Sequence, residues 1–209
     1  MNYGELLIKG SLKKEILLST YICHPSMANN ETSGPTVQTF IAKWLLEKKR
    51  KFSYRIVFVP ETIGSIAYVN KNIKSLKKNV YAGFIINCLG DERNYSYLPS
   101  RKGNTISDKV ALHVLNNFHK NYKRYEWKDR ASDERQYCSP GVDLPIATIM
   151  KTRYGDYKEY HTSLDDFKNV VSKKGLSDGF EVIKKTILAI EYNFFPKAVY
   201  TCEPFLSKR

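Results

Sequence analysis

Five residues in the polar stretches of the sequence have side chains that can bind a metal or move a proton. His24 and Glu61 each follow an apolar run closely, whereas Asp133, Glu134 and His161 lie in later polar stretches. Imidazole nitrogens and carboxylate oxygens are common zinc ligands, and a carboxylate beside the metal can take a proton from water. Together these residues predict hydrolytic zinc chemistry, although a single loop histidine is more often an ordinary hydrogen-bonded residue.

The segments around these residues predict alternating strands and helices. Short apolar runs rich in β-branched and aromatic residues predict strands over 15–22, 54–59, 80–90 and 144–150. Apolar residues at helical spacing predict helices over 35–51, 64–79, 106–122 and 172–195. This alternation predicts an α/β fold, a three-layer sandwich around a largely parallel central sheet.

The polar segments follow or flank the predicted strands. These segments are residues 23–34, 60–62, 87–94 and 132–139. Ligands of parallel α/β sheets bind at the carboxyl ends of the strands. We therefore expect the four segments to meet in space and to form one site.

Composition indicates a globular protein. The chain has 209 residues, of which 42% are hydrophobic, which is enough for one domain with its own core. The net charge of +13 comes from lysines spread over loops and helix faces, and no motif for specific nucleic-acid binding accompanies them. Because the sequence has neither a long apolar span nor a signal-peptide pattern, we expect a cytoplasmic protein.

Four cysteines lie far apart in the sequence and form no C-x-x-C pair. They are Cys23, Cys88, Cys138 and Cys202. This spacing predicts neither a zinc ribbon nor a disulfide framework. The first three lie beside proposed site segments and could ligate zinc as thiolates, but we interpret them as small packing residues.

Four ordered segments resemble the aminopeptidase-like domain of bacterial proteins from polysaccharide-biosynthesis clusters. These segments are residues 23–34, 58–68, 132–145 and 159–167. That group in turn is similar to the co-catalytic zinc aminopeptidases, with their phosphorylase/hydrolase-like sandwich. Relatives of full length commonly carry a winged-helix module after this domain. We therefore expect residues 1–209 to be a single aminopeptidase-like domain from a short or truncated member.

The resemblance assigns roles to individual residues. It implies that His24 and His161 stand at metal-ligand positions and that Glu61 stands where the general base or an adjacent ligand is expected. Asp133 would line the site. Four further residues are candidates to line it: Glu31, Asp91, Glu134 and Tyr137.

The sequence departs from the pattern of the two-zinc enzymes. Asn30 stands where those enzymes have the aspartate that bridges both ions, and an amide is neutral and a poorer bridge. Thr62 replaces the second glutamate after Glu61, and Asn87 with Cys88 replaces a later aspartate, for which Asp91 is only a nearby substitute. We therefore expect one weakly held zinc ion on His24 and His161, with Asn30 or Glu31 as an oxygen ligand.

Three functions remain open at this point. The first is a zinc-dependent hydrolase of amide or peptide bonds that acts on a small peptide-like or amino-sugar-like substrate and has a role in surface polysaccharide biosynthesis. The second is a catalytically impaired domain of the same fold that binds a ligand or a partner protein. The third is a polyanion-binding module, which only the net charge supports.

Overall fold

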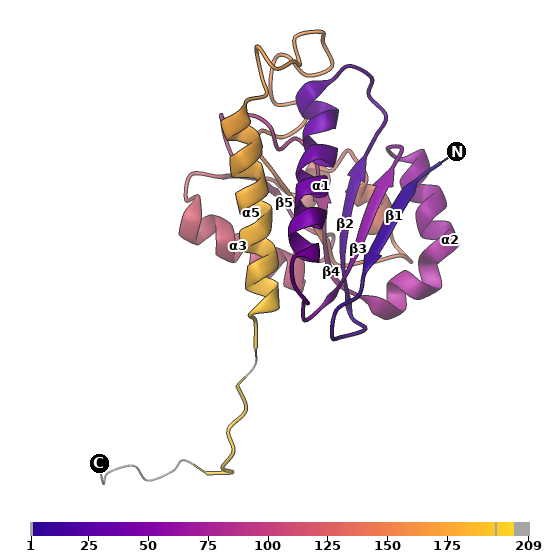
Figure 1. Ribbon diagram of the computed structural model, residues 1–209, viewed down its shortest axis with the longest axis vertical. Helices are drawn as coiled ribbons and strands as arrows, with labels where there is room; N and C mark the ends of the chain where they lie inside the picture. Colours follow the sequence, from indigo (N-terminus) through magenta and orange to yellow (C-terminus); the bar gives the residue numbers. More distant parts are fainter. Residues whose placement is uncertain (1, 195, 203–209) are drawn as a thin grey trace, which may run out of the picture.

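A seven-stranded sheet forms the centre of the protein. The computed structural model describes residues 2–194 and 196–202 (Figure 1). The strands are β1 (Gly4–Ile8), β2 (Glu15–Tyr21), β3 (Ser53–Val59), β4 (Val80–Ile86), β5 (Ser96–Leu98), β6 (Lys123–Arg124) and β7 (Ile146–Met150). Their order is β1-β3-β2-β4-β7-β5-β6, and β3, β2, β4 and β7 run parallel to one another. This arrangement confirms the predicted α/β fold with a largely parallel sheet.

Helices cover both faces of the sheet. They are α1 (Ser33–Leu46), α2 (Ile63–Asn79), α3 (Ile106–Phe118), α4 (Glu134–Tyr137) and α5 (Lys173–Glu191), with a π-helical turn η1 (Ala28–Thr32) and a 3-10 turn η2 (Trp127–Asp129). Figure 1 shows α1, α3 and α5 on one side of the sheet and α2 on the other. No helix in the described residues is both long and apolar enough to cross a membrane.

Alternating strand residues fill two apolar cores, one on each face of the sheet. Leu17 and Ile85 pack with Tyr68 of α2, whereas Leu18 and Phe84 pack beneath α1, α3 and α5. All five side chains are fully buried. The period-two alternation of a strand therefore divides the apolar residues between two helical layers, which gives the three-layer sandwich.

Three strands, β1, β5 and β6, were not predicted. β1 pairs antiparallel with β3, but Leu6 and Leu7 are each 41% exposed, so the strand lacks a buried apolar face that would mark it in the sequence. β5 and β6 have only three and two residues. Two or three residues are too few to show the period of a strand, even in β5, whose three residues are all buried.

Most of the predicted strands and helices extend beyond the ends of the observed ones. The helix predicted over 35–51 starts two residues earlier, at Ser33, and ends at Leu46, and the strand predicted over 80–90 ends at Ile86. The chain leaves the sheet at Cys88, whose φ of 45° is incompatible with a continuing strand. The last predicted helix ends at Glu191, and its predicted final residue, Phe195, lies outside the described residues.

Close packing of α5 fixes the loop that follows β4. A Cβ atom on Gly175 would overlap the carbonyl oxygen of Gly90, so the helix approaches the loop more closely than any larger residue allows. The amide of Gly90 donates to Asn29 Oδ1 at 2.9 Å. Through this loop, α5 supports the turn η1, which carries part of the candidate site.

Replacement of Gly175 by alanine should destabilise the protein. We expect Gly175→Ala to lower the free energy of unfolding by about 1–3 kcal/mol, because the added methyl group must push α5 away from Gly90. Ser177→Ala on the exposed side of the same helix is the matched control and should change stability little. Urea denaturation measures both, and equal stability of Gly175→Ala and the unmodified protein would contradict this view of the packing.

Candidate metal and catalytic site

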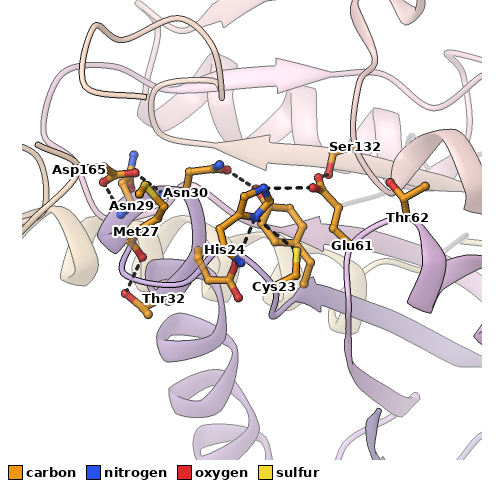
Figure 2. Close-up of polar contacts among 12 residues, drawn as sticks. Cys23, His24, Met27, Asn29, Asn30, Thr32, Glu61, Thr62, Ser132 and Asp165 are labelled. Atoms are coloured by element: carbon orange, nitrogen blue, oxygen red, sulfur yellow. Dashed lines mark hydrogen bonds and ion pairs between the residues drawn. The ribbon is translucent and has the colours of Figure 1, made fainter. Parts of the chain in front are cut away.

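His24 and Glu61 lie face to face at the carboxyl ends of β2 and β3 (Figure 2). His24 Nε2 is 3.6 Å from Glu61 Oε2. The hydroxyl of Ser132 donates to the other oxygen of Glu61, Oε1, at 2.5 Å. The structure therefore brings together two of the predicted site residues, and the hydrogen bond from Ser132 orients the glutamate.

The opposite side of the His24 ring faces a carboxylate and a thiol. Glu31 Oε2 accepts a hydrogen bond from the His24 backbone N–H and lies 3.2 Å from Nδ1, and Cys23 Sγ is 3.3 Å from the same nitrogen. One donor atom from each of these three residues lies within 4.8 Å of the others. Cys23 is exposed, so it is a candidate ligand of this cluster and not the packing residue that the sequence suggested.

The thiol of Cys23 holds its proton in the metal-free protein. Partial burial, together with the nearby carboxylates of Glu31 and Glu61, raises the pKa of Cys23 to about 11. A bound cation would favour the thiolate, because metal binding displaces protons from its ligands. Zinc binding through this thiol would therefore release a proton.

His161 approaches the same cluster from the loop before α5. Its ring centre is 4.9 Å from that of His24, and its other neighbour is Tyr160, which stacks on it at 3.9 Å. The backbone of His161 has a φ of 56°, an unusual conformation for a residue other than glycine. The structure thus places both predicted histidine ligands side by side, although they are far apart in the sequence.

Asn30 lies on the inner side of the cluster. Its Oδ1 accepts a hydrogen bond from the hydroxyl of Tyr21 at 2.5 Å and lies 3.6 Å from Cys88 Sγ. Its Nδ2 is buried and has no partner within the described part of the chain. Burial raises the pKa values of both Tyr21 and Cys88, so these neighbours are neutral at physiological pH.

Asp165 holds the turn η1, and the sequence analysis did not assign it a role. Its carboxylate accepts hydrogen bonds from the backbone N–H groups of Asn29 and Asn30 at 2.7 and 2.9 Å (Figure 2). The hydroxyl of Tyr157 donates to the same carboxylate at 3.1 Å. The residue is fully buried. The only signal for it in the sequence was its position four residues after His161 in the segment 159–167.

Asp91 and Tyr137 form buried hydrogen bonds that hold neighbouring segments together. Asp91 accepts hydrogen bonds from the backbone N–H and hydroxyl of Thr152 at 2.9 and 2.7 Å, which ties the loop after β4 to the end of β7. Tyr137 is fully buried, and its hydroxyl lies 2.8 Å from Ser19 Oγ. Both side chains are therefore hydrogen-bonded to other residues of the protein.

Glu134 anchors the loop that carries Ser132. Its Oε1 accepts hydrogen bonds from the backbone N–H groups of Ala131 and Ser132 and from the hydroxyl of Tyr154, at 2.7–3.0 Å. The Glu134 side chain is fully buried. Glu134 therefore positions the serine that orients Glu61.

Asp133 supports the turn after Glu61. Its Oδ1 accepts hydrogen bonds from the Thr62 N–H at 2.7 Å and from the Ser65 hydroxyl at 2.9 Å, whereas Oδ2 is buried without a partner among the described residues. Thr62 has a φ of 59°, so this carboxyl group stabilises a strained turn. Burial raises the pKa of Asp133 to about 7.

The comparisons with known proteins place this chain in a family. A family model described as Domain of unknown function (DUF4910) matches residues 1–193, so the chain belongs to this family. A Clostridium acetobutylicum protein, named as a candidate polysaccharide biosynthesis protein with an aminopeptidase-like domain, is 41% identical over 214 residues. The match covers 100% of this chain and 48% of that protein. The resemblance seen in the sequence is confirmed.

Solved structures show the same fold. A crystal structure of a candidate peptidase from Clostridium acetobutylicum has a TM-score of 0.91 and 41% identity, covering 99% of this chain and 49% of that one. BSAP, a zinc aminopeptidase from Bacillus subtilis, has a TM-score of 0.71 at 14% identity, covering 90% and 49%. The chain therefore has a zinc-aminopeptidase fold and spans about half the length of the curated relative it matches.

The raised pKa of Asp133 predicts a pH dependence of stability. Because the folded pKa of about 7 lies above the ordinary value of 3.8, the folded protein binds more protons than the unfolded chain between these two pH values. The free energy of unfolding of the zinc-free protein should therefore fall as pH rises from 4 to 7, with a contribution from this group of about 1 kcal/mol per pH unit.

Asp133→Asn isolates this contribution, because the amide cannot titrate but still offers an oxygen to Thr62 and Ser65. Urea denaturation at several pH values should show a smaller decline in the free energy of unfolding from about pH 4 to 7 for this variant than for the unmodified protein. The same dependence of the unfolding free energy on pH in both proteins would show that Asp133 is ionised in the folded state throughout this range.

Proposed function

We propose that this chain is a zinc-dependent, aminopeptidase-like hydrolase of amide or peptide bonds. The observation that carries the proposal is the position of His24 between Glu61 on one side and Glu31 with Cys23 on the other. His161 adds a second imidazole 4.9 Å from the His24 ring. A base and a set of zinc ligands thus converge at one edge of the sheet.

The residues of this cluster fit one zinc ion. Imidazole, carboxylate and thiolate groups are all usual zinc ligands, and the cluster offers each of them from His24, Glu31 and Cys23, with His161 beside them. When bound, zinc would polarise the substrate carbonyl and lower the pKa of water. A second ion would need donors on the inner side, where the oxygen of Asn30 is already hydrogen-bonded to Tyr21.

Glu61 is the proposed general base. Its Oε1 accepts the hydrogen bond from Ser132, so Oε2 is the oxygen directed toward His24 and available to take a proton from the attacking water. Glu61 would then deliver this proton to the departing amine. Ser132 and Glu134 have a positioning role, because they fix the side-chain rotamer in which Glu61 accepts the proton.

The proposed substrate is a small peptide-like or amino-sugar-like molecule with an amide bond. The candidate role of the Clostridium acetobutylicum relative in polysaccharide biosynthesis supports an amino sugar, and the fold of the zinc aminopeptidases supports an aminoacyl group. Both have an amide carbonyl, which is the group that this chemistry attacks. A screen with both kinds of substrate distinguishes them.

A second candidate function is a catalytically impaired domain that binds its ligand without turnover. The inner side of the site favours it, because Asn30, Asn87 and Cys88 are neutral where a two-metal centre needs carboxylates. Both amide atoms of Asn87 are buried without a partner in the part of the chain that the structure describes. Binding of a substrate with no hydrolysis in the presence of zinc would favour this function.

Replacement of Glu61 by glutamine should remove the base and keep the fold. We expect Glu61→Gln to lower turnover of an aminoacyl or amidated-sugar substrate by about 100-fold or more, because the amide cannot accept a proton. Amine release in the presence of zinc measures this effect. Glu126→Gln, at a glutamate that is 72% exposed, is the matched control and should hydrolyse at the unmodified rate. Equal rates for Glu61→Gln and the control would remove Glu61 from the mechanism.

Replacement of Asn30 by aspartate should strengthen zinc binding and lower the stability of the zinc-free protein. The new carboxylate would put a charge where Nδ2 is buried without a partner in the described residues, at a cost of about 1–3 kcal/mol in unfolding free energy. With zinc present, the same charge should tighten binding by about 10-fold or more.

Zinc titration against a competing chelator and urea denaturation measure the two effects of Asn30→Asp. Asn70→Asp on the exposed face of α2 adds the same charge away from the site and serves as the control. Equal zinc affinity in the two variants, or tight binding of two zinc ions by the unmodified protein, would contradict the role given to Asn30.

A further inference from the structure

We propose a second binding site, in which the ammonium group of Lys151 binds a small oxyanion, either a phosphate or a carboxylate group of a ligand. The site is a pocket of about 310 Å³ that Lys151 lines just after β7, Tyr95 just before β5 and His119 at the end of α3. None of the residues proposed to hold zinc lines this pocket. The proposal does not depend on the hydrolase activity.

Lys151 is a buried cation without an adequate partner. Its side chain is only 2% exposed, and Nζ makes no hydrogen bond within residues 2–194 and 196–202. The nearest carboxylate oxygen in that part of the chain is Asp178 Oδ2 at 3.9 Å, and this oxygen is already bound by Lys174 Nζ at 2.5 Å. Because an unpaired buried ammonium group is costly, an anion bound beside Lys151 would stabilise it.

Tyr95 holds Lys151 at the pocket wall. Nζ lies 3.6 Å from the centre of the Tyr95 ring, and the His119 ring stacks on Tyr95 with a centre-to-centre distance of 3.9 Å. Two groups so close to the ring centre must occupy opposite faces of the ring. Tyr95 therefore fixes the positions of both polar groups, since its cation–π contact stabilises the ammonium and its stacking orients the imidazole.

His119 is a neutral side chain on the other face of Tyr95. Its Nε2 is buried and has no partner within the described residues. Burial and the positive charge of Lys151 lower the pKa of His119, so the ring is neutral and one of its nitrogens can donate a hydrogen bond. Because His119 and Lys151 lie on opposite faces of Tyr95, a small oxyanion cannot contact both, and the ammonium of Lys151 is the group that binds it.

The charge at the pocket rim favours an anion. Lys120 and Arg93 line it on the basic side, and Glu92 is the acidic residue in the lining. The carboxylate of Glu92 accepts a hydrogen bond from Ser172, and Arg93 is paired with Glu159 at 2.8 Å. When Glu92 is counted against one of the two lysines, Lys151 and Lys120 leave one excess positive charge, which a phosphate or carboxylate would neutralise through charge-assisted hydrogen bonds.

Calorimetric titration with inorganic phosphate, and separately with acetate, tests the proposal on the whole chain. We expect the unmodified protein to bind at least one of these anions, and the stronger one identifies the type of oxyanion. Lys151→Met, which keeps the length of the apolar stem, should weaken that binding by about 10-fold or more. Lys128→Met changes the net charge equally at an exposed site and should bind like the unmodified protein.

Lys151→Met is expected to fold, because replacement of an unpaired buried charge by an apolar group is rarely destabilising. If it does not fold, His119→Ala at the half-buried end of α3 replaces it; at least about 5-fold weaker binding is expected, because this change removes the stacking that fixes Tyr95 against the Lys151 ammonium. Binding of the same strength in the folded variant and the Lys128→Met control would overturn the proposal. Absence of binding of either anion to the unmodified protein would also overturn it.

Discussion

The carboxylate of Asp165 fixes the turn on which the candidate site depends. It binds the backbone N–H groups of Asn29 and Asn30, and its own backbone carbonyl accepts from the N–H of Ala28 at 2.8 Å. Hydrogen bonds to a charged group each contribute about 1.5–3 kcal/mol. Because the loop that carries Asp165 also carries His161, one interaction sets both the conformation of η1 and the distance between the two histidines.

The electrostatics of the site divide it into an outer anionic part and an inner neutral part. Glu31 and Glu61 flank His24 on the outer side, whereas Tyr21, Asn30 and Cys88 form a hydrogen-bonded neutral group on the inner side. A divalent cation is stabilised by nearby carboxylates and gains little from protonated tyrosine or thiol groups. This distribution of charge explains why the proposed function uses one zinc ion.

The sequence predicted the parallel strands and their helices because each has a strong apolar period. It also predicted that His24, Glu61 and His161 would converge, since the first two follow parallel strands and all three belong to segments of a recognisable family. Asp165 was not predicted, because its role is to bind backbone N–H groups of a turn more than 130 residues away, and side-chain type does not reveal such a contact. Lys151 was missed for a related reason, since only the packed structure shows that its charge is buried.

Zinc binding by the two histidines is measured most directly by titration of zinc-free protein against a chromophoric chelator. We expect one zinc ion per chain in the unmodified protein, and about 100-fold weaker binding in both His24→Ala and His161→Ala, because each loses a strong ligand. His113→Ala, on the exposed face of α3, is the matched control and should bind zinc normally. Unchanged zinc affinity in both site variants would contradict the assignment of a metal centre to this edge of the sheet.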